Sequence, residues 1–207
     1  MKIGMFGGTF NPPHKGHLRL IETFAGKLEL DKVLVIPDKR PVHKICEDLA
    51  LDSDRAELCR RTFTGKNYEV STMQIRDTDS YMIFTVNEIL SKYKDAQLFL
   101  IIGSDMFLSF HKWYKYREIM KKCTLCVMSR EDEDTVKALR SYAFSTLQIY
   151  MPSNEANGII ISPSSPLEVS STEIRRKISA GEDVSDVLTK EAYEFIKERG
   201  MYGYAKK

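Results

Sequence analysis

Short apolar segments alternate along the chain with segments whose apolar residues recur at helical spacing. Each short segment is long enough for one buried strand and is bounded by turn residues. These segments are residues 2–6, 32–36, 69–75, 97–102, 124–128 and 158–161. The helical patterns lie at residues 16–28, 54–63, 84–93, 114–121 and 134–142. Because strands that alternate with helices form parallel sheets covered on both faces, the pattern predicts a doubly wound α/β fold.

Two further helical patterns end the chain, at residues 170–180 and 189–199, and a glycine follows each of them. No internal repeat, low-complexity tract or linker interrupts the sequence, so we expect residues 1–207 to form a single domain. The longest irregular stretches are residues 37–53 and 151–169. Long loops in a compact domain are more often functional than idle, so both are candidate binding segments.

Composition narrows the class of protein. With 43% hydrophobic residues in 207, the chain can bury a sizeable core, which excludes disordered and fibrous proteins. The net charge of +2 argues against a nucleic-acid or membrane partner but leaves an anionic substrate open. No apolar stretch reaches about 18 residues, and the first strand begins without a signal-like leader. We therefore expect a soluble cytoplasmic protein, and we leave homo-oligomer formation open.

The cysteines are the first candidates for a metal site or a disulfide. They are Cys46, Cys59, Cys123 and Cys126, and the last two match the pattern C-x-x-C. That pair lies in an apolar run, where a strand would send residues three apart to opposite faces, and no second close pair completes a zinc site. We predict thiols buried in the core and no bound metal.

The run GGTFNPPHKGH, from Gly7 to His17, combines a strand end, a glycine turn and two histidines. Gly7 and Gly8 let a ligand approach the backbone closely, and His14 and His17 stand where a helix begins. Unpaired N–H groups and the helix dipole favour anions at such a place. The alternative is a helix cap beside a partly buried polar residue.

Neither common phosphate motif is present. G-x-G-x-x-G does not follow the first strand, and G-x-x-x-x-G-K-[ST] occurs nowhere, which argues against dinucleotide-dependent hydride transfer and P-loop hydrolysis. A second anion motif lies in the run SSTEIR, from Ser170 to Arg175. It reads as an S-x-x-E capping box with a basic residue one turn later. A well-capped surface helix is its alternative explanation.

Together the two motifs resemble the (H/T)xGH and ISSTxIR signatures of the nucleotidylyltransferase superfamily. The resemblance covers essentially the whole chain and is closest to the bacterial nicotinate mononucleotide adenylyltransferases. It implies a Rossmann-like doubly wound parallel sheet of the nucleotidylyltransferase type with C-terminal helices. It also implies formation of deamido-NAD and pyrophosphate from ATP and nicotinate mononucleotide, a step of NAD biosynthesis.

Four intermediate segments agree with this family. Residues 40–44 resemble its PPHK loop, residues 80–85 its SYTxxT segment, residues 103–105 its G(A/S)D turn and residues 112–114 its KWY segment. The departures from the family pattern are Val42, Met82, Phe84 and Val169. Met82 and Phe84 flank the part of the pocket where the family reads the pyridine base, so they affect nucleotide selectivity more than the chemistry.

The resemblance implies three sets of site residues. ATP would bind Gly7, Gly8, Thr9, Phe10, His17, Gly103, Asp105, Ser170, Ser171, Thr172 and Arg175. The implied catalytic residues are His14, His17, Lys44 and Arg175, and the implied residues for the second nucleotide are Lys44, Thr85, Trp113 and Tyr114. Trp113 would stack on the nicotinate ring, with a core anchor as the alternative. Asp105 would meet a ribose hydroxyl, with a structural turn residue as the alternative.

The reaction needs no general base. A phosphate monoester has a second pKa of about 6, so the attacking group is already an anion at neutral pH. Catalysis is then positioning plus stabilisation of charge on the α-phosphate and the departing pyrophosphate. We expect Mg²⁺ to arrive bound to ATP, because the phosphate motifs carry no carboxylate cluster.

Two alternatives stay open. One is an adenylyltransferase acting on nicotinamide mononucleotide or another small phosphate such as phosphopantetheine. The other is a nucleotide-binding regulatory module without turnover.

Overall fold

The structure is a computed structural model, and it describes residues 1–39, 49–75, 81–129, 133–149, 158–163 and 169–204. Six strands form one sheet in the order β3-β2-β1-β4-β5-β6. They are β1 (Lys2–Gly8), β2 (Lys32–Pro37), β3 (Tyr68–Val70), β4 (Gln97–Gly103), β5 (Cys123–Ser129) and β6 (Ile159–Pro163). The predicted α/β fold with a doubly wound parallel sheet is confirmed.

The strand order places a switch point between β1 and β4. From β1 the chain moves outward in one direction through β2 and β3, and β4 then begins the other half of the sheet. The pair is parallel, with Met5 opposite Leu100, so both carboxyl ends meet at one edge. Gly8 ends β1, directly after Gly7, and Gly103 ends β4. Ligands of doubly wound sheets bind beyond such a switch point, which makes this edge the first place to look for a site.

The helices follow the predicted positions with shifted ends. They are α1 (Lys15–Leu28), α2 (Asp52–Thr62), α3 (Met82–Lys92), α4 (Ser104–Leu108), α5 (Tyr116–Lys122), α6 (Glu133–Ser145), α7 (Ser171–Ser179) and α8 (Lys190–Arg199), with 3-10 turns η1 (Phe110–Lys112) and η2 (Met201–Gly203). Among these described helices only α4 was not predicted, because five residues are too few to show a helical period.

Two other differences have local causes. The strand predicted at residues 69–75 ends at Val70, because Ile75 N–H bonds to the Thr72 carbonyl in a turn instead of continuing the ladder. The helix predicted from residue 114 begins at Tyr116, because Lys115 adopts the left-handed conformation with φ of 54°. Both cases show local turn chemistry overriding an apolar pattern.

Contacts divide the chain into two compact units. The first contains Met1–Gly7, Leu20–Leu34 and Tyr81–Pro166, and the second contains Gly8–Arg19, Val35–Ser80 and Leu167–Lys207. The expectation of one domain over residues 1–207 therefore stays a prediction. In the described parts, no helix is long and apolar enough to cross a membrane.

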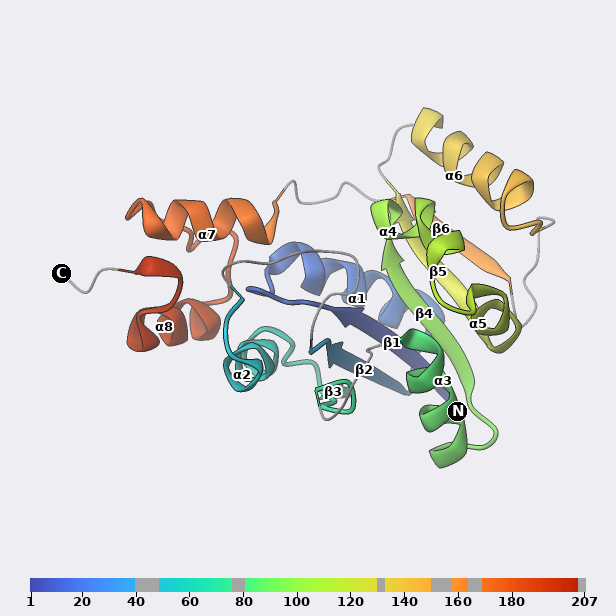
Figure 1. Cartoon of the computed structure of the whole chain (residues 1–207), viewed down its shortest axis with the longest axis horizontal. Helices are drawn as coiled ribbons and strands as arrows, with labels where there is room; N and C mark the ends of the chain where they lie inside the picture. Colours follow the sequence, from blue (N-terminus) through green and yellow to red (C-terminus); the bar gives the residue numbers. More distant parts are fainter. Residues whose placement is uncertain (40–48, 76–80, 130–132, 150–157, 164–168, 205–207) are drawn as a thin grey trace. The chain divides into compact units, whose positions relative to one another are not determined.

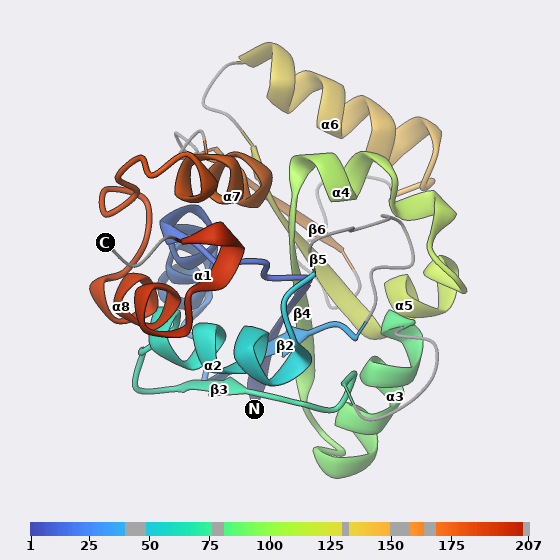
Figure 2. The same ribbon diagram turned by 60° about the vertical axis from the view of Figure 1, so that its left-hand side comes forward.

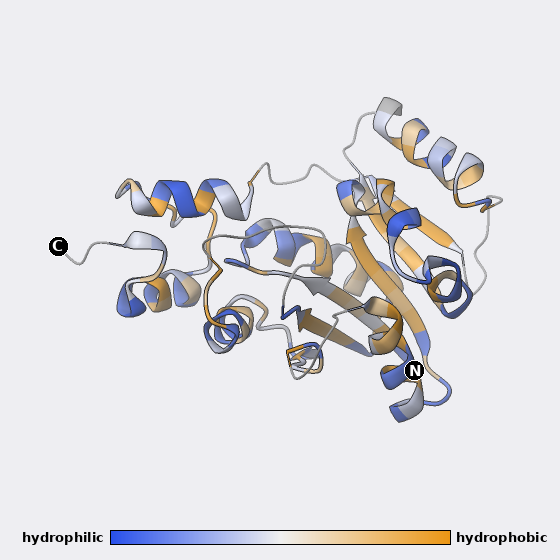
Figure 3. Cartoon of the chain, viewed as in Figure 1, coloured by the Kyte–Doolittle hydropathy of each residue, from blue (hydrophilic) through white to orange (hydrophobic). Residues whose placement is uncertain are grey.

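The first unit is built on a buried parallel sheet. Every residue of β5 is buried, and α4, α5 and α6 pack against it. Figure 1 shows β4, β5 and β6 side by side, and in Figure 3 β4 and β5 are coloured as largely hydrophobic. Cys123 and Cys126 are free thiols inside β5, and Cys59 is a free thiol buried in α2. Core thiols are thus confirmed for these three, whereas Cys46 lies outside the described residues.

The second unit gathers α2, α7, α8 and η2 around one apolar cluster. Its core includes Leu58, Ile174, Ile178, Leu188, Phe195 and Ile196. Figure 2 shows these helices around the red C-terminal turn. Both predicted helix starts are confirmed: the Ser170 side chain accepts the Glu173 N–H, and the Thr189 side chain accepts the Ala192 N–H. Gly200, at φ of 61°, ends α8 as predicted.

This cluster gives a stability prediction. Leu58 is fully buried, so Leu58→Ala should lower the free energy of unfolding by about 2 to 5 kcal/mol. Leu51 directly precedes the same helix and is 66% exposed, so Leu51→Ala should change it by less than about 0.5 kcal/mol. Urea denaturation followed by circular dichroism measures both. A similar loss in the two variants would contradict the packing described for the second unit.

Candidate active site

The first motif forms a loop that we call the histidine loop, residues 8–17, in the second unit. Phe10 is buried at its base with φ of 49°, a conformation that a phenylalanine rarely adopts. A Cβ on Gly8 would lie 3.1 Å from the Phe10 ring, so glycine lets the ring fold under the loop. The ring edge meets His17 with centroids 5.3 Å apart. The Phe10 ring therefore packs against the His17 ring and limits how that ring can turn.

The two histidines are coupled in geometry. Their rings stack with centroids 3.7 Å apart, and the backbone N–H of His14 points to Nδ1 of His17 at 3.2 Å. Because a backbone N–H can only donate, Nδ1 of His17 is an acceptor. The proton of the neutral His17 ring is therefore on Nε2, and the backbone itself fixes the tautomer that can donate to a ligand.

Burial keeps both rings uncharged. Desolvation lowers the pKa of His14 to about 4. Desolvation also lowers the pKa of His17 well below its ordinary value, and the neighbouring His14 adds to the effect. Both side chains are thus neutral at pH 7 and can donate hydrogen bonds only through N–H groups. An anion placed beside them would favour protonation and raise both pKa values.

Gly16 of the motif is explained by close contact. A Cβ at this position would lie 3.0 Å from Nδ1 of His14 and 3.3 Å from the Val169 side chain. Nδ1 of His14 is also buried and makes no hydrogen bond among the described residues. The glycine between the two histidines therefore leaves room for the His14 ring beside the first turn of α1.

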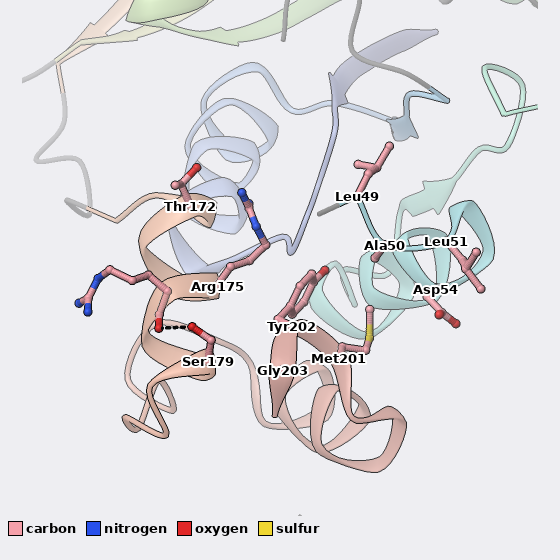
Figure 4. Close-up of a pocket in the computed structure, with 11 residues that line it drawn as sticks. Leu49, Ala50, Leu51, Asp54, Thr172, Arg175, Ser179, Met201, Tyr202 and Gly203 are labelled. Atoms are coloured by element: carbon pink, nitrogen blue, oxygen red, sulfur yellow. Dashed lines mark hydrogen bonds between the residues drawn. The ribbon is translucent and has the colours of Figure 1, made fainter. Parts of the chain in front are cut away.

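The second motif contacts the first inside the same unit. Ser171 donates from Oγ to the Pro12 carbonyl at 2.8 Å, across 159 positions of sequence. Arg175 donates from its guanidinium to the Asn11 carbonyl at 2.9 Å. Thr172 and Arg175 line one pocket, which Figure 4 shows in close-up. The start of α7 and the histidine loop thus form one polar site.

A buried arginine holds this site together, and no motif indicated it. The Arg55 side chain is fully buried and donates to the carbonyls of Thr9 at 2.7 Å, Lys39 at 3.2 Å and Ala50 at 3.3 Å. It also pairs with Asp52 at 2.6 Å and with Asp38 at 3.5 Å. The only available signal is that Arg55 occurs on the apolar face of α2, three residues before Leu58.

Asp38 belongs to the same network. Its carboxylate accepts the Thr9 hydroxyl at 3.2 Å, and its backbone N–H donates to the Gly8 carbonyl at 3.0 Å. Burial raises the pKa of Asp38, and Arg55 opposes that change. Lys44 lies outside the described residues, but Lys39 and Ala50 on either side of residues 40–48 both bond to Arg55.

The first unit holds the remaining candidate residues. Gly7 is the last but one residue of β1, Gly103 ends the neighbouring strand β4, and Asp105 lies in the first turn of α4. A Cβ on Gly103 would lie 2.8 Å from Oδ1 of Asp105, so the glycine makes room for this carboxylate. The exposed Asp105 is therefore presented at the carboxyl end of β4.

The residues expected to bind the second nucleotide lie around α3 and η1. Thr85 is buried on α3, and Trp113 is half-buried with its ring 5.1 Å from that of Phe110. Tyr114 is 47% exposed, and Phe84, one of the departures from the family, is 54% exposed. The rings of Phe84 and Tyr114 are 6.1 Å apart. The departure at position 84 therefore places an exposed aromatic ring beside Tyr114.

A family model described as cytidylyltransferase-like matches residues 5–177. The chain belongs to the cytidylyltransferase-like family. The match includes both motifs, the second half of β1 and the other five strands. Two relatives in this family carry the name "probable nicotinate-nucleotide adenylyltransferase". The one from Listeria monocytogenes serotype 4a is 31% identical over 98% of this chain and 97% of its own length. The one from Neisseria meningitidis serogroup B is 32% identical over 97% of this chain and 98% of its own length.

Solved structures agree with the cytidylyltransferase-like fold. Nicotinic acid mononucleotide adenylyltransferase of Plasmodium falciparum, complexed with NaAD, superimposes with a TM-score of 0.74 over 99% of this chain and 98% of that chain. A second structure of that protein, complexed with APC, gives a TM-score of 0.71. Sequence identity is 12% and 13%, so these likenesses establish the fold.

The buried histidines predict how the stability of this cytidylyltransferase-like protein depends on pH. Folded His14 stays neutral down to about pH 4, whereas the unfolded side chain binds a proton near pH 6.5. The unfolded state therefore gains protons first as the pH falls, and His14 should cost about 2 kcal/mol of stability between pH 7.5 and pH 5. Urea denaturation at both pH values, with the non-titrating variant His14→Gln beside it, measures this cost. Equal pH dependence in both proteins would show that His14 does not carry the effect.

Proposed function

We propose that this protein transfers the adenylyl group of ATP to nicotinate mononucleotide, giving deamido-NAD and pyrophosphate in NAD biosynthesis. The observation that carries the proposal is the contact between the two motifs, in which Ser171 and Arg175 bond to the loop that holds His14 and His17. The relatives from Listeria and Neisseria are named for this activity, and this chain aligns with almost their whole length.

The chemistry follows from the charge on each group. The oxygen of the nucleotide phosphate attacks the α-phosphorus of ATP, and the bond from this phosphorus to the β-phosphate oxygen breaks, so that pyrophosphate leaves with the electron pair. Nε2–H of His17 is suited to donate to the α-phosphate as charge develops there. The Arg175 guanidinium can bind phosphate oxygens through N–H groups that Asn11 does not use. Lys44 would add a second cation as a point charge.

Mg²⁺ enters this scheme as part of the substrate MgATP. Among the described residues, no group of three or more His, Cys, Asp or Glu side chains is arranged to hold a metal ion. Mg²⁺ prefers oxygen ligands and is commonly held by substrate phosphates with few protein ligands. The protein side chains would therefore orient the phosphates, and the ion would neutralise part of their charge.

The second nucleotide is proposed to bind at the aromatic residues of the first unit. Trp113 offers a half-buried ring face for the pyridine, and the backbone near Thr85 and Tyr114 would receive its carboxylate. Asp105, presented at the end of β4, is proposed to meet a ribose hydroxyl. We also propose a cytoplasmic location. Light scattering would measure whether the protein forms a homo-oligomer.

A second candidate function has its own observation. Phe84 and Met82 replace residues of the family pattern, and Phe84 lies beside Tyr114. This apolar surface could reduce the preference for the acid nucleotide, so the amide nucleotide is the alternative substrate.

Removing the histidine donor should abolish most turnover. His17→Ala should lower kcat at least about a hundredfold, because one hydrogen-bond donor to developing charge is worth that much in transition-state stabilisation. Pyrophosphate release measures the rate, and circular dichroism checks the fold. The control Arg60→Ala removes an exposed cation of α2 that pairs with Glu57 and does not line the pocket, and it should leave kcat unchanged. Near-normal turnover of His17→Ala would refute the catalytic role of this residue.

Substrate choice is a separate prediction. Pyrophosphate release should be measured with nicotinate mononucleotide, nicotinamide mononucleotide and phosphopantetheine under identical conditions, and nicotinate mononucleotide should give the highest kcat/KM. Equal values for the first two would contradict selectivity for the acid. Fastest release with phosphopantetheine would assign a different member of this reaction class, and no release with any of them would support a regulatory module that binds nucleotide.

A further inference from the structure

The C-terminal turn η2 contains a tyrosine in a strained conformation. Tyr202 has φ of 57° and ψ of 31°, in the left-handed region that residues other than glycine rarely adopt. Its neighbours Gly200 and Gly203 have φ of 61° and 75°, and glycine adopts such angles at no cost. Such strained residues persist only where the surrounding structure holds them in place, and they cluster at functional sites.

The partner of Tyr202 is Asn11 of the histidine loop. The hydroxyl donates to Oδ1 of Asn11 at 2.9 Å, and burial raises the pKa of Tyr202 above its ordinary value, so this donor keeps its proton. The same Oδ1 accepts the Ala50 N–H at 3.1 Å. Asn11 is only 3% exposed, so losing one of these donors would leave a buried oxygen less well satisfied.

Asn11 is also the residue that holds Arg175. Its backbone carbonyl accepts a guanidinium N–H at 2.9 Å, while its side chain is held by Tyr202 and Ala50. Figure 4 shows Arg175 and Tyr202 side by side on the wall of one pocket, which has a volume of about 760 Å³. The position of Asn11 therefore determines where the carbonyl that accepts from the Arg175 guanidinium lies.

We propose that Tyr202 is a positioning residue for ATP binding, which acts through Asn11 to hold Arg175 in its phosphate-binding orientation. This inference rests on the proposed function in one respect, namely that Arg175 binds the triphosphate. It assigns a role at the phosphate site to a residue near the C-terminal end of the chain, outside the segment that the family model matches.

The alternative is that Tyr202 only packs. Its ring lies against the apolar cluster of the second unit, as does that of Tyr204. Tyr202→Phe separates the two roles, because it keeps the ring and removes only the hydroxyl. Tyr204→Phe is the matched control, because it removes a hydroxyl from the same segment.

The test is MgATP binding measured by calorimetry, together with steady-state kinetics. Tyr202→Phe should raise the Kd for MgATP about fivefold, the size expected for loss of one hydrogen bond. The KM for ATP should rise likewise, with little change in the KM for nicotinate mononucleotide, and Tyr204→Phe should match the wild type. An unchanged Kd in Tyr202→Phe, or an equal change in Tyr204→Phe, would overturn the proposal.

A double-mutant cycle tests the route through Arg175. In the Arg175→Met background, where the guanidinium is absent, Tyr202→Phe should no longer change the Kd for MgATP. The same fivefold change in that background would overturn positioning through Arg175 and leave a packing role. If the wild type binds MgATP but releases no pyrophosphate with any acceptor, the proposed function fails, and the binding cycle still decides the role of Tyr202.

Discussion

A single buried charge organises the polar end of the second unit. Removing the Arg55 guanidinium from water is expensive, and the cost is offset only because three carbonyls and two carboxylates surround it. These partners belong to the histidine loop, to the end of β2 and to the start of α2. The position of each segment is therefore tied to the other two. A change in one of them leaves a buried donor or acceptor unpaired, so the geometry of the loop is kept by electrostatics as much as by packing.

The charge distribution at the site differs from that of a simple cationic pocket. The two histidines of the histidine loop are neutral at pH 7, and Arg175 already donates to a backbone carbonyl. The protein as a whole carries a net charge of only +2. Affinity for a polyanion must therefore come from oriented N–H donors and one or two local cations rather than from a broad positive field.

Elements with strong local signals were predictable from the sequence. The capping box at Ser170 and the glycine after α8 are local chemistry, and the order of strands and helices follows from the apolar period. The histidines were found because their spacing forms a motif. The S-x-x-E pattern followed by a basic residue marked Ser170 to Arg175 as a candidate anion site, but the contacts of Ser171 and Arg175 with residues 12 and 11 required the folded chain.

Arg55 and Tyr202 show where sequence reasoning ends. An arginine on a helix ordinarily suggests a solvated face, and nothing nearby in sequence shows that this guanidinium is enclosed by the histidine loop, the end of β2 and the start of α2. Tyr202 is separated from Asn11 by 191 positions, so their hydrogen bond has no local pattern. Both residues act through long-range contacts, which a single sequence does not record.

The stacked histidines also set how many protons the site can hold. Rings 3.7 Å apart cannot both be charged without strong repulsion, and burial disfavours charge on either one. The pair thus behaves as one coupled titrating unit, in which a proton on one ring opposes protonation of the other. An anion bound beside the rings would raise their pKa values and so favour protonation. Nucleotide binding would then be linked to proton uptake, and the heat of binding would contain the ionisation heat of whichever buffer supplies the proton.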